Sequence, residues 1–189
     1  AALLSHVRRG ITAAEVALRV ELLRAMAVDD EARLAKGLAG APADPRLPGP
    51  IQDAMHGLTA PLHVKEQVAA EETIYQVPDE RRTMLDYQRN AVIHRYVGPA
   101  LVAAAVRAAG PHTGEAVRGR ALLLSRLFKL EFMYRVGATF DDIFAHDGAL
   151  LMERGALSRV DDELRPGPDL DTLAFLAEFT RAYLEAYRV

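Results

Sequence analysis

The sequence predicts a mainly α, helical bundle-like domain that contains one short β-hairpin. Apolar residues recur at helical spacing along most of the 189 residues. Capping residues and glycine or proline stop signals divide this pattern into successive helices. Apolar and polar residues alternate, as they do in a strand pair, only within about residues 62–77, where the hairpin is expected.

The first half of the chain is expected to hold short helices, a linker and the hairpin. Ala2–Arg8 is predicted to be a short helix, and the capping box Thr12-Ala-Ala-Glu15 begins a second one. Gly37–Pro50 is crowded with glycine and proline, which is typical of a flexible surface connection. The other expected elements are a short helix around Ile51–Gly57 and the strands Leu62–Val68 and Thr73–Val77, separated by Ala69–Glu72.

From Pro78 onward the pattern predicts only helices and loops. The helices are expected over Asp79–Val97, Ala100–Ala109, Glu115–Arg135, Thr139–Arg154 and Asp169–Tyr187. Glycine or proline follows most of these segments and ends them. Ser158–Pro168 is expected to be a loop.

We interpret residues 1–189 as a single C-terminal helical accessory domain, because a chain of this length can bury one core. Its expected parts are leading helices (1–36), a Gly/Pro-rich linker (37–50), a short helix with the hairpin (51–78) and a helical bundle (79–189). The chain opens within a helix-like pattern and without Met, so we expect it to be part of a longer protein.

Composition excludes several kinds of protein. A formal net charge of −3 argues against a dedicated nucleic-acid binder, which usually carries a basic excess. The absence of cysteine excludes disulfides, thiolate catalysis and cysteine-ligated metals. The longest apolar run, Val97–Val106, is far too short to span a bilayer, and the start of the chain does not resemble a signal peptide.

The most informative stretch is LDYQRNAVIH, Leu85–His94, within a predicted helix. Tyr87, Asn90 and His94 follow one another at spacings of three and four, so they fall within about 60° on one side of that helix. Apolar residues occupy the opposite side. We therefore expect both sides to be buried, with the polar stripe bonded in a structural network or lining a site.

Glu131 is the second residue of interest. On the predicted helix Glu115–Arg135 it lies among leucine and phenylalanine side chains, where a carboxylate is costly unless it is paired. We expect Glu131 to bond an arginine, with Arg135 or Arg89 as the leading candidates. The candidate polar network is therefore Tyr87, Arg89, Asn90, His94, Glu131 and Arg135, and a structural role is favoured over a catalytic one.

Three segments occur in a fixed order: ALLSHVRRGITAAEVALRVELLR at the start, Leu-x-Tyr-x-Arg-Asn-x-x-x-His at Leu85–His94, and LSRLFKLEF at Leu124–Phe132. Together they resemble the C-terminal region of the glycerol-3-phosphate acyltransferases and of the related dihydroxyacetone-phosphate acyltransferases. The resemblance extends from Ala1 to about Tyr187. Family members commonly carry an aromatic residue where this chain has Gln88, so no stacking role is expected there.

The resemblance implies acyl transfer from acyl-CoA or an acyl-carrier protein to glycerol 3-phosphate, the first step of phospholipid synthesis. In that family a His-x-x-x-x-Asp motif supplies the general base. None of the six histidines here is followed by Asp five positions later. We therefore expect no catalytic residue, cofactor site or metal site in this segment, and we place the reactive block before it.

The same resemblance implies the partners and the location. The expected partners are the N-terminal acyltransferase domain of the parent protein and, through that domain, the acyl donor and glycerol 3-phosphate. Contact with a membrane surface is also expected, whereas nucleic acid is not. The parent is expected on the cytoplasmic side of the cell membrane, with this segment itself soluble.

Other chemical motifs are weak. Asp142 and His146, with Asp147 adjacent, have a spacing that can ligate a metal, but a surface ion pair is the favoured interpretation. No serine lies in a Gly-x-Ser-x-Gly elbow. The basic groups that could face lipid or phosphate are Arg8-Arg9, Arg81-Arg82 and the set Arg118, Arg120, Arg126 and Lys129.

Three alternatives stay open at this point. The acceptor can be dihydroxyacetone phosphate instead of glycerol 3-phosphate. The early helices and the hairpin loosely match a winged helix-turn-helix regulator, although acidic residues on the would-be recognition helix oppose this. A stand-alone scaffold domain, in which the Tyr-Asn-His stripe is purely structural, fits the sequence equally well.

Overall fold

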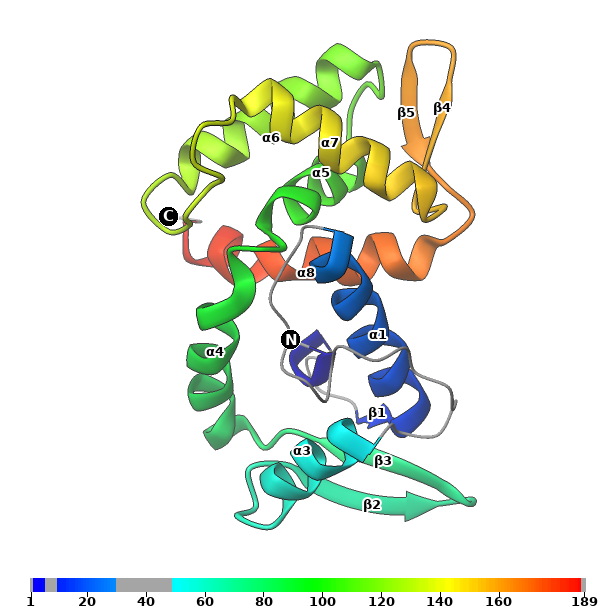
Figure 1. Ribbon diagram of the computed structural model, residues 1–189, viewed down its shortest axis with the longest axis vertical. Helices are drawn as coiled ribbons and strands as arrows, with labels where there is room; N and C mark the ends of the chain where they lie inside the picture. Colours follow the sequence, from blue (N-terminus) through cyan, green and yellow to red (C-terminus); the bar gives the residue numbers. More distant parts are fainter. Residues whose placement is uncertain (1, 6–9, 30–48, 188–189) are drawn as a thin grey trace. The chain divides into compact units, whose positions relative to one another are not determined.

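The computed structural model describes residues 2–5, 10–29 and 49–187 (Figure 1). These residues are mostly helical, which confirms the predicted fold class. The chain divides into two compact units, Ala1–Ala91 (unit 1) and Val92–Val189 (unit 2). The boundary falls near the end of helix α4 (Asp79–Ile93). The interpretation as a single domain stays a prediction.

Unit 1 combines helices with a small antiparallel sheet. Its elements are η1 (Ala2–Ser5), β1 (Ile11–Thr12), α1 (Ala13–Asp29), α3 (Gly49–Thr59), β2 (Lys65–Ala69), β3 (Glu72–Gln76) and most of α4. The predicted capping box is confirmed, because the Glu15 N–H donates to Thr12 Oγ1 and the Thr12 N–H donates to Glu15 Oε2, each at 3.1 Å. Residues 6–8 of the first predicted helix and residues 37–48 of the predicted linker lie outside the described residues, and the linker's last two residues begin α3.

The predicted hairpin is confirmed as β2 and β3, with Ala69 opposite Glu72. Ala70 and Glu71 form its turn, and both have positive φ values, of 51° and 68°, as a tight hairpin turn requires. The sequence did not predict β1, which pairs with β3 to give the order β1-β3-β2. A strand of two residues has too little alternation to be recognised.

One core holds unit 1 together. Tyr75 of β3 and Leu85 of α4 are buried in it with residues of α1 and α3. The buried members of this cluster are Ile11, Val16, Ile51, Met55, Val64, Tyr75, Val77 and Leu85. Leu85 lies on the apolar side of the helix that carries the Tyr-Asn-His stripe, and this side packs into the core of unit 1 there, as the periodicity indicated.

Unit 2 is organised around α5 (Val97–Arg107), which packs against α6 (Gly114–Leu127), α7 (Phe140–Glu153) and α8 (Leu170–Ala186). In Figure 1, α8 lies on one side of α5, and α6 and α7 lie on the other. Nearly all α5 side chains are buried. A helix that is apolar around most of its circumference is stable only in such a central position.

Two predicted helix ends are wrong. The helix expected over Asp79–Val97 ends at Ile93, and α5 starts at Val97 with Pro99 in its first turn. Proline is tolerated in a first turn because that position lacks an intrahelical acceptor for an N–H. The helix expected to reach Arg135 ends at Leu127, since the chain turns there and buries Phe128.

A second hairpin was missed. Residues 158–168, expected to be a loop, form β4 (Leu157–Val160) and β5 (Glu163–Pro166), and Asp161 turns between them with a φ of 54°. The strands are mostly polar, so their alternation is weak, but Leu157 and Leu164 are buried. The prediction of a single hairpin was therefore wrong.

The ends of the last helices were predicted well. Thr139 caps α7 in a full capping box with Asp142. Gly155, with a φ of 71°, follows the end of α7. The Asp169 side chain accepts a hydrogen bond from the Thr172 N–H at the start of α8. Within the described part of the chain, no helix combines the length and apolar character needed to cross a bilayer.

Candidate functional site

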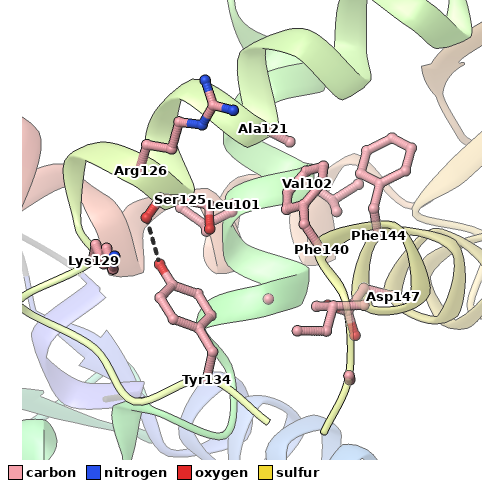
Figure 2. A pocket seen from close by; sticks show the side chains of 13 residues that line it. Leu101, Val102, Ala121, Ser125, Arg126, Lys129, Tyr134, Phe140, Phe144 and Asp147 are labelled. Carbon is pink, nitrogen blue, oxygen red and sulfur yellow. Dashed lines mark hydrogen bonds between the residues drawn. The ribbon is translucent and has the colours of Figure 1, made fainter. Parts of the chain in front are cut away.

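A cavity of about 240 Å³ opens between α5, α6 and α7 within unit 2 (Figure 2). It is smaller than the pockets that usually hold drug-sized ligands, so it suits a small group or one end of a longer molecule. Its lining comprises Gly98, Leu101, Val102, Ala121, Ser125, Arg126, Lys129, Tyr134, Ala138, Phe140, Ile143, Phe144 and Asp147. None of the six predicted network residues lies in this set.

One side of the cavity is apolar. Leu101 and Val102 come from the buried helix α5, and both are almost fully inaccessible to solvent. Phe140 and Phe144, one turn apart on α7, stack with ring centroids 5.9 Å apart. This side therefore offers mainly apolar contacts to a bound group.

A buried carboxylate, Asp147 of α7, lies at the edge of this wall. Gly98 makes room for it, because a Cβ at that position would come within 2.0 Å of Asp147 Oδ2. Gly98 belongs to the first turn of α5, where the helix dipole is positive. The carboxylate therefore lies next to a helix N-terminus, in room left by a glycine that the sequence did not single out.

The opposite side of the cavity is polar and cationic, because Arg126 and Lys129 lie there near Ser125 (Figure 2). The Tyr134 hydroxyl donates a hydrogen bond to the Ser125 carbonyl at 3.3 Å, and burial raises the pKa of Tyr134. Tyr134 thus stays neutral. Among the described residues, Arg126 and Lys129 form no ion pair, so this side can attract an anionic group.

The α4 members of the predicted network make local contacts. Arg89 Nη1 lies 2.9 Å from Asp86 Oδ1, and Arg89 Nη2 donates to Asn90 Oδ1 at 3.2 Å. Tyr87 is 80% exposed, so the prediction that this side of the helix is buried is wrong at its first residue. Arg89 therefore pairs within its own helix, and its ion pair with Asp86 is expected for opposite charges one turn apart.

The unit 2 members of the predicted network contact the segment that follows α6. His94 lies just past the end of α4, and its Nδ1 accepts a hydrogen bond from the Met133 N–H at 3.1 Å. Glu131 does not bond an arginine, because its partner in the described structure is the Tyr187 hydroxyl, which donates to Glu131 Oε1 at 2.8 Å. Arg135 is exposed. The network as a whole stays a prediction.

Glu131 differs from its prediction because the helix beneath it ends early. After Leu127 the chain forms turns, so the helical geometry that placed Glu131 on an apolar side does not apply. Phe128 and Phe132 take the buried positions instead, and Glu131 is exposed. The hydrogen bond to Glu131 is the main reason that the pKa of Tyr187 is raised.

Several residues of the weaker sequence motifs have structural roles. Asp142 belongs to the α7 capping box, and its hydrogen bonds with Thr139 lower its pKa. No cluster of potential metal ligands occurs among the residues that the structure describes. Arg118 pairs with Asp141 at 2.6 Å, and Arg120 donates to the backbone carbonyls of Ala105 and Pro111.

The first basic groups also have structural explanations where they are described. Arg82 lies 3.3 Å from Asp79. On α1, Arg24 bonds Glu21 through two nitrogens. Arg8-Arg9 lies outside the described residues.

The sequence model of the glycerol-3-phosphate acyltransferase C-terminal region matches residues 1–189, the whole chain. A search of curated proteins found no significant match. The chain therefore belongs to the glycerol-3-phosphate acyltransferase C-terminal region family, which confirms the resemblance noted in its sequence segments.

Proposed function

We propose that this member of the family is the non-catalytic C-terminal part of a glycerol-3-phosphate 1-O-acyltransferase. Such an enzyme transfers an acyl group from acyl-CoA or an acyl-carrier protein to glycerol 3-phosphate. The observation that carries the proposal is the family match along the whole chain, combined with the absence of a His-x-x-x-x-Asp motif from all 189 residues. The reactive histidine then belongs to an acyltransferase domain that precedes this segment in the parent protein.

The geometry of unit 2 is consistent with a non-catalytic role for this segment. Its cavity has an apolar wall, two cations and a buried carboxylate, but the imidazole of His146, the histidine nearest in sequence to that carboxylate, is exposed and absent from the lining. The general base of the family is a histidine, which must lie within reach of a substrate hydroxyl, and no imidazole lines this cavity. In the proposal, this arrangement binds a substrate group and positions it for the acyltransferase domain. In the proposal, the segment packs on the acyltransferase domain and helps wall the substrate cleft.

The polar candidates take positioning roles in the same proposal. His94 and Glu131 hold the segment after α6 through their bonds to Met133 and Tyr187. The proposal adds two separate contacts with the acyltransferase domain, one at Tyr87, Arg89 and Asn90 of unit 1 and one at Arg135 of unit 2. Their exposure or local pairing is compatible with a surface that another domain covers.

The decisive experiment measures thiol release from acyl-CoA by the purified chain, with glycerol 3-phosphate in one arm and dihydroxyacetone phosphate in the other. We expect a folded protein that shows no turnover in either arm. The parent protein assayed in parallel identifies its acceptor, and therefore separates the two acyltransferase alternatives. Turnover by the chain alone would contradict the proposal, since a catalytic group would then lie within these residues.

A further inference from the structure

The cavity between α5, α6 and α7 has room for a small ring system and little more. An apolar cavity of about 150 Å³ in a protein core holds one benzene molecule. By the same measure, the cavity of about 240 Å³ holds about ten non-hydrogen atoms. Leu101 and Val102 of the central helix α5 line it, and both side chains are buried. A ligand that the cavity encloses is therefore compact, and a long carbon chain does not fit inside it.

Three aromatic rings contribute to the lining of the cavity, those of Tyr134, Phe140 and Phe144 (Figure 2). The Phe140 and Phe144 rings are stacked, with their planes 26° apart. The Arg118 guanidinium carbon lies 5.6 Å from the centroid of the Phe140 ring, which helps to hold that ring in place. Because pairs of rings gain energy beyond the burial of their area, this lining favours an aromatic ligand over a saturated one.

The charges around the cavity favour a ligand with one negative charge. The lining contains two cations, Arg126 and Lys129, and one carboxylate, Asp147, which gives it a net charge of +1. The two cations form no ion pair among the described residues, so both can pair with an anionic group. Arginine pairs with carboxylates through two parallel hydrogen bonds. A single carboxylate on the cationic side balances the charge and stays away from Asp147.

We propose that this cavity binds small aromatic carboxylates, with the ring against Phe140 and Phe144 and the carboxylate at Arg126 and Lys129. The proposal rests on the proposed function in one respect, since both treat the cavity as a binding site. It adds a class of ligand that is neither the acyl donor nor the acceptor.

Isothermal titration calorimetry of the full chain tests this proposal with a matched set of ligands. We expect 3-phenylpropionate to bind with a dissociation constant below about 1 mM. The neutral analogue 3-phenylpropanamide should bind at least about tenfold more weakly, because it has no charge for the two cations. The saturated analogue 3-cyclohexylpropionate should bind about threefold more weakly, because it makes no contacts between rings.

Substitutions in the lining locate the bound ligand. R126Q/K129Q should weaken binding of 3-phenylpropionate by about tenfold. Phe144→Leu keeps an apolar side chain but removes a ring, so it should weaken binding by about threefold. The matched control R107Q/R159Q removes the same charge from exposed positions outside the lining and should bind as the unsubstituted chain does. All of these variants should keep the circular dichroism spectrum of the unsubstituted chain.

Four results would overturn the proposal. They are a folded chain that releases or absorbs no heat with millimolar 3-phenylpropionate, equal affinity for the neutral amide, tighter binding of the dianion phenyl phosphate, and equal losses in R126Q/K129Q and its control. The titrations use the chain without any acyl donor, so they are independent of the acyl-transfer assay. Turnover by the chain alone would contradict the proposed function and leave the affinities measured here unchanged.

Discussion

The two segments that carry the family resemblance inside the chain, Leu85–His94 and Leu124–Phe132, are fixed in different ways. Within the first, Arg89 bonds its helical neighbours Asp86 and Asn90, and Tyr87 faces solvent. The second leaves its helix after Leu127, and distant parts of unit 2 hold it. Similar patterns of apolar and charged residues thus produce a locally satisfied helix in one case and a turn that depends on tertiary contacts in the other.

This difference shows that helical periodicity predicts a helix reliably only where no distant contact favours another backbone conformation. The pattern continues past Leu127 to Arg135, but burying Phe128 and Phe132 against α8 stabilises a turn instead. Burying an aromatic side chain is worth more than the propensity of a few helical residues. Substitutions of the buried aromatic residues of the second segment should therefore lower stability far more than substitutions of the exposed residues of the first.

The largest effect is expected for Phe128→Ala. Phe128 is fully buried among three aromatic rings, so its removal leaves a cavity that the surrounding side chains cannot fill. We expect a loss of about 3–5 kcal/mol in the free energy of unfolding, measured by urea denaturation. The control Leu130→Ala, two residues along and exposed, should change it by less than about 0.5 kcal/mol. Equal losses in both variants would contradict the finding that Phe128 is buried and Leu130 is exposed.

A smaller loss is expected for His94→Ala. The substitution removes the acceptor of the Met133 N–H and the edge-to-face contact with Phe132, whose centroid lies 6.0 Å away. The expected cost is about 1–2 kcal/mol by urea denaturation. His94→Asn, which restores an acceptor without the ring, should recover part of this loss. If His94→Ala were neutral, His94 would not link the end of α4 to the second segment.

Tyr187→Phe should cost less than His94→Ala, because the bond between Tyr187 and Glu131 is exposed to solvent. The hydrogen bond to Glu131, followed by burial and the carboxylate charge, raises the pKa of Tyr187 above its usual value of about 10. A raised pKa means that the stabilisation is present below about pH 10 and is lost as the pH rises through the folded-state pKa. Glu131→Gln removes the main cause of the raised pKa, so tyrosinate absorbance should show one tyrosine titrating at lower pH, and Tyr187→Phe should identify that tyrosine by removing it. An unchanged titration would disprove the contact.

Tyr87→Ala should have the smallest effect. The side chain is 80% exposed, so its removal is expected to change the free energy of unfolding by no more than about 0.5 kcal/mol. The measurement is again a urea transition of the full chain. A loss of stability comparable to that of His94→Ala would show that the Tyr-Asn-His stripe is a buried network after all.

Signals confined to neighbouring residues could be predicted from the sequence. The capping box at Thr12, the helix start at Thr139 and the Ala70-Glu71 hairpin formed where local patterns placed them. Such features depend on residues within one or two turns, so the sequence contains all the information that they need. The family resemblance likewise depended on ordered segments, and the family match confirmed it.

Features that depend on distant contacts could not be predicted. The early end of α6, the second hairpin and the room that Gly98 leaves for Asp147 are all set by packing between elements far apart in sequence. The cavity was missed for the same reason, although the pair Phe140 and Phe144, one turn apart, was a usable signal for one wall. The partner of Glu131 was wrong because it was inferred from a helix that does not extend that far.

The central claim is that this segment supports acyl transfer without performing it. The most direct test removes residues 1–189 from the parent protein, measures acylation of glycerol 3-phosphate by the remainder, and then adds the purified chain back. The account predicts that the remainder loses most of its activity and that the added chain, inert alone, restores it. Full activity of the remainder without the chain would contradict the account.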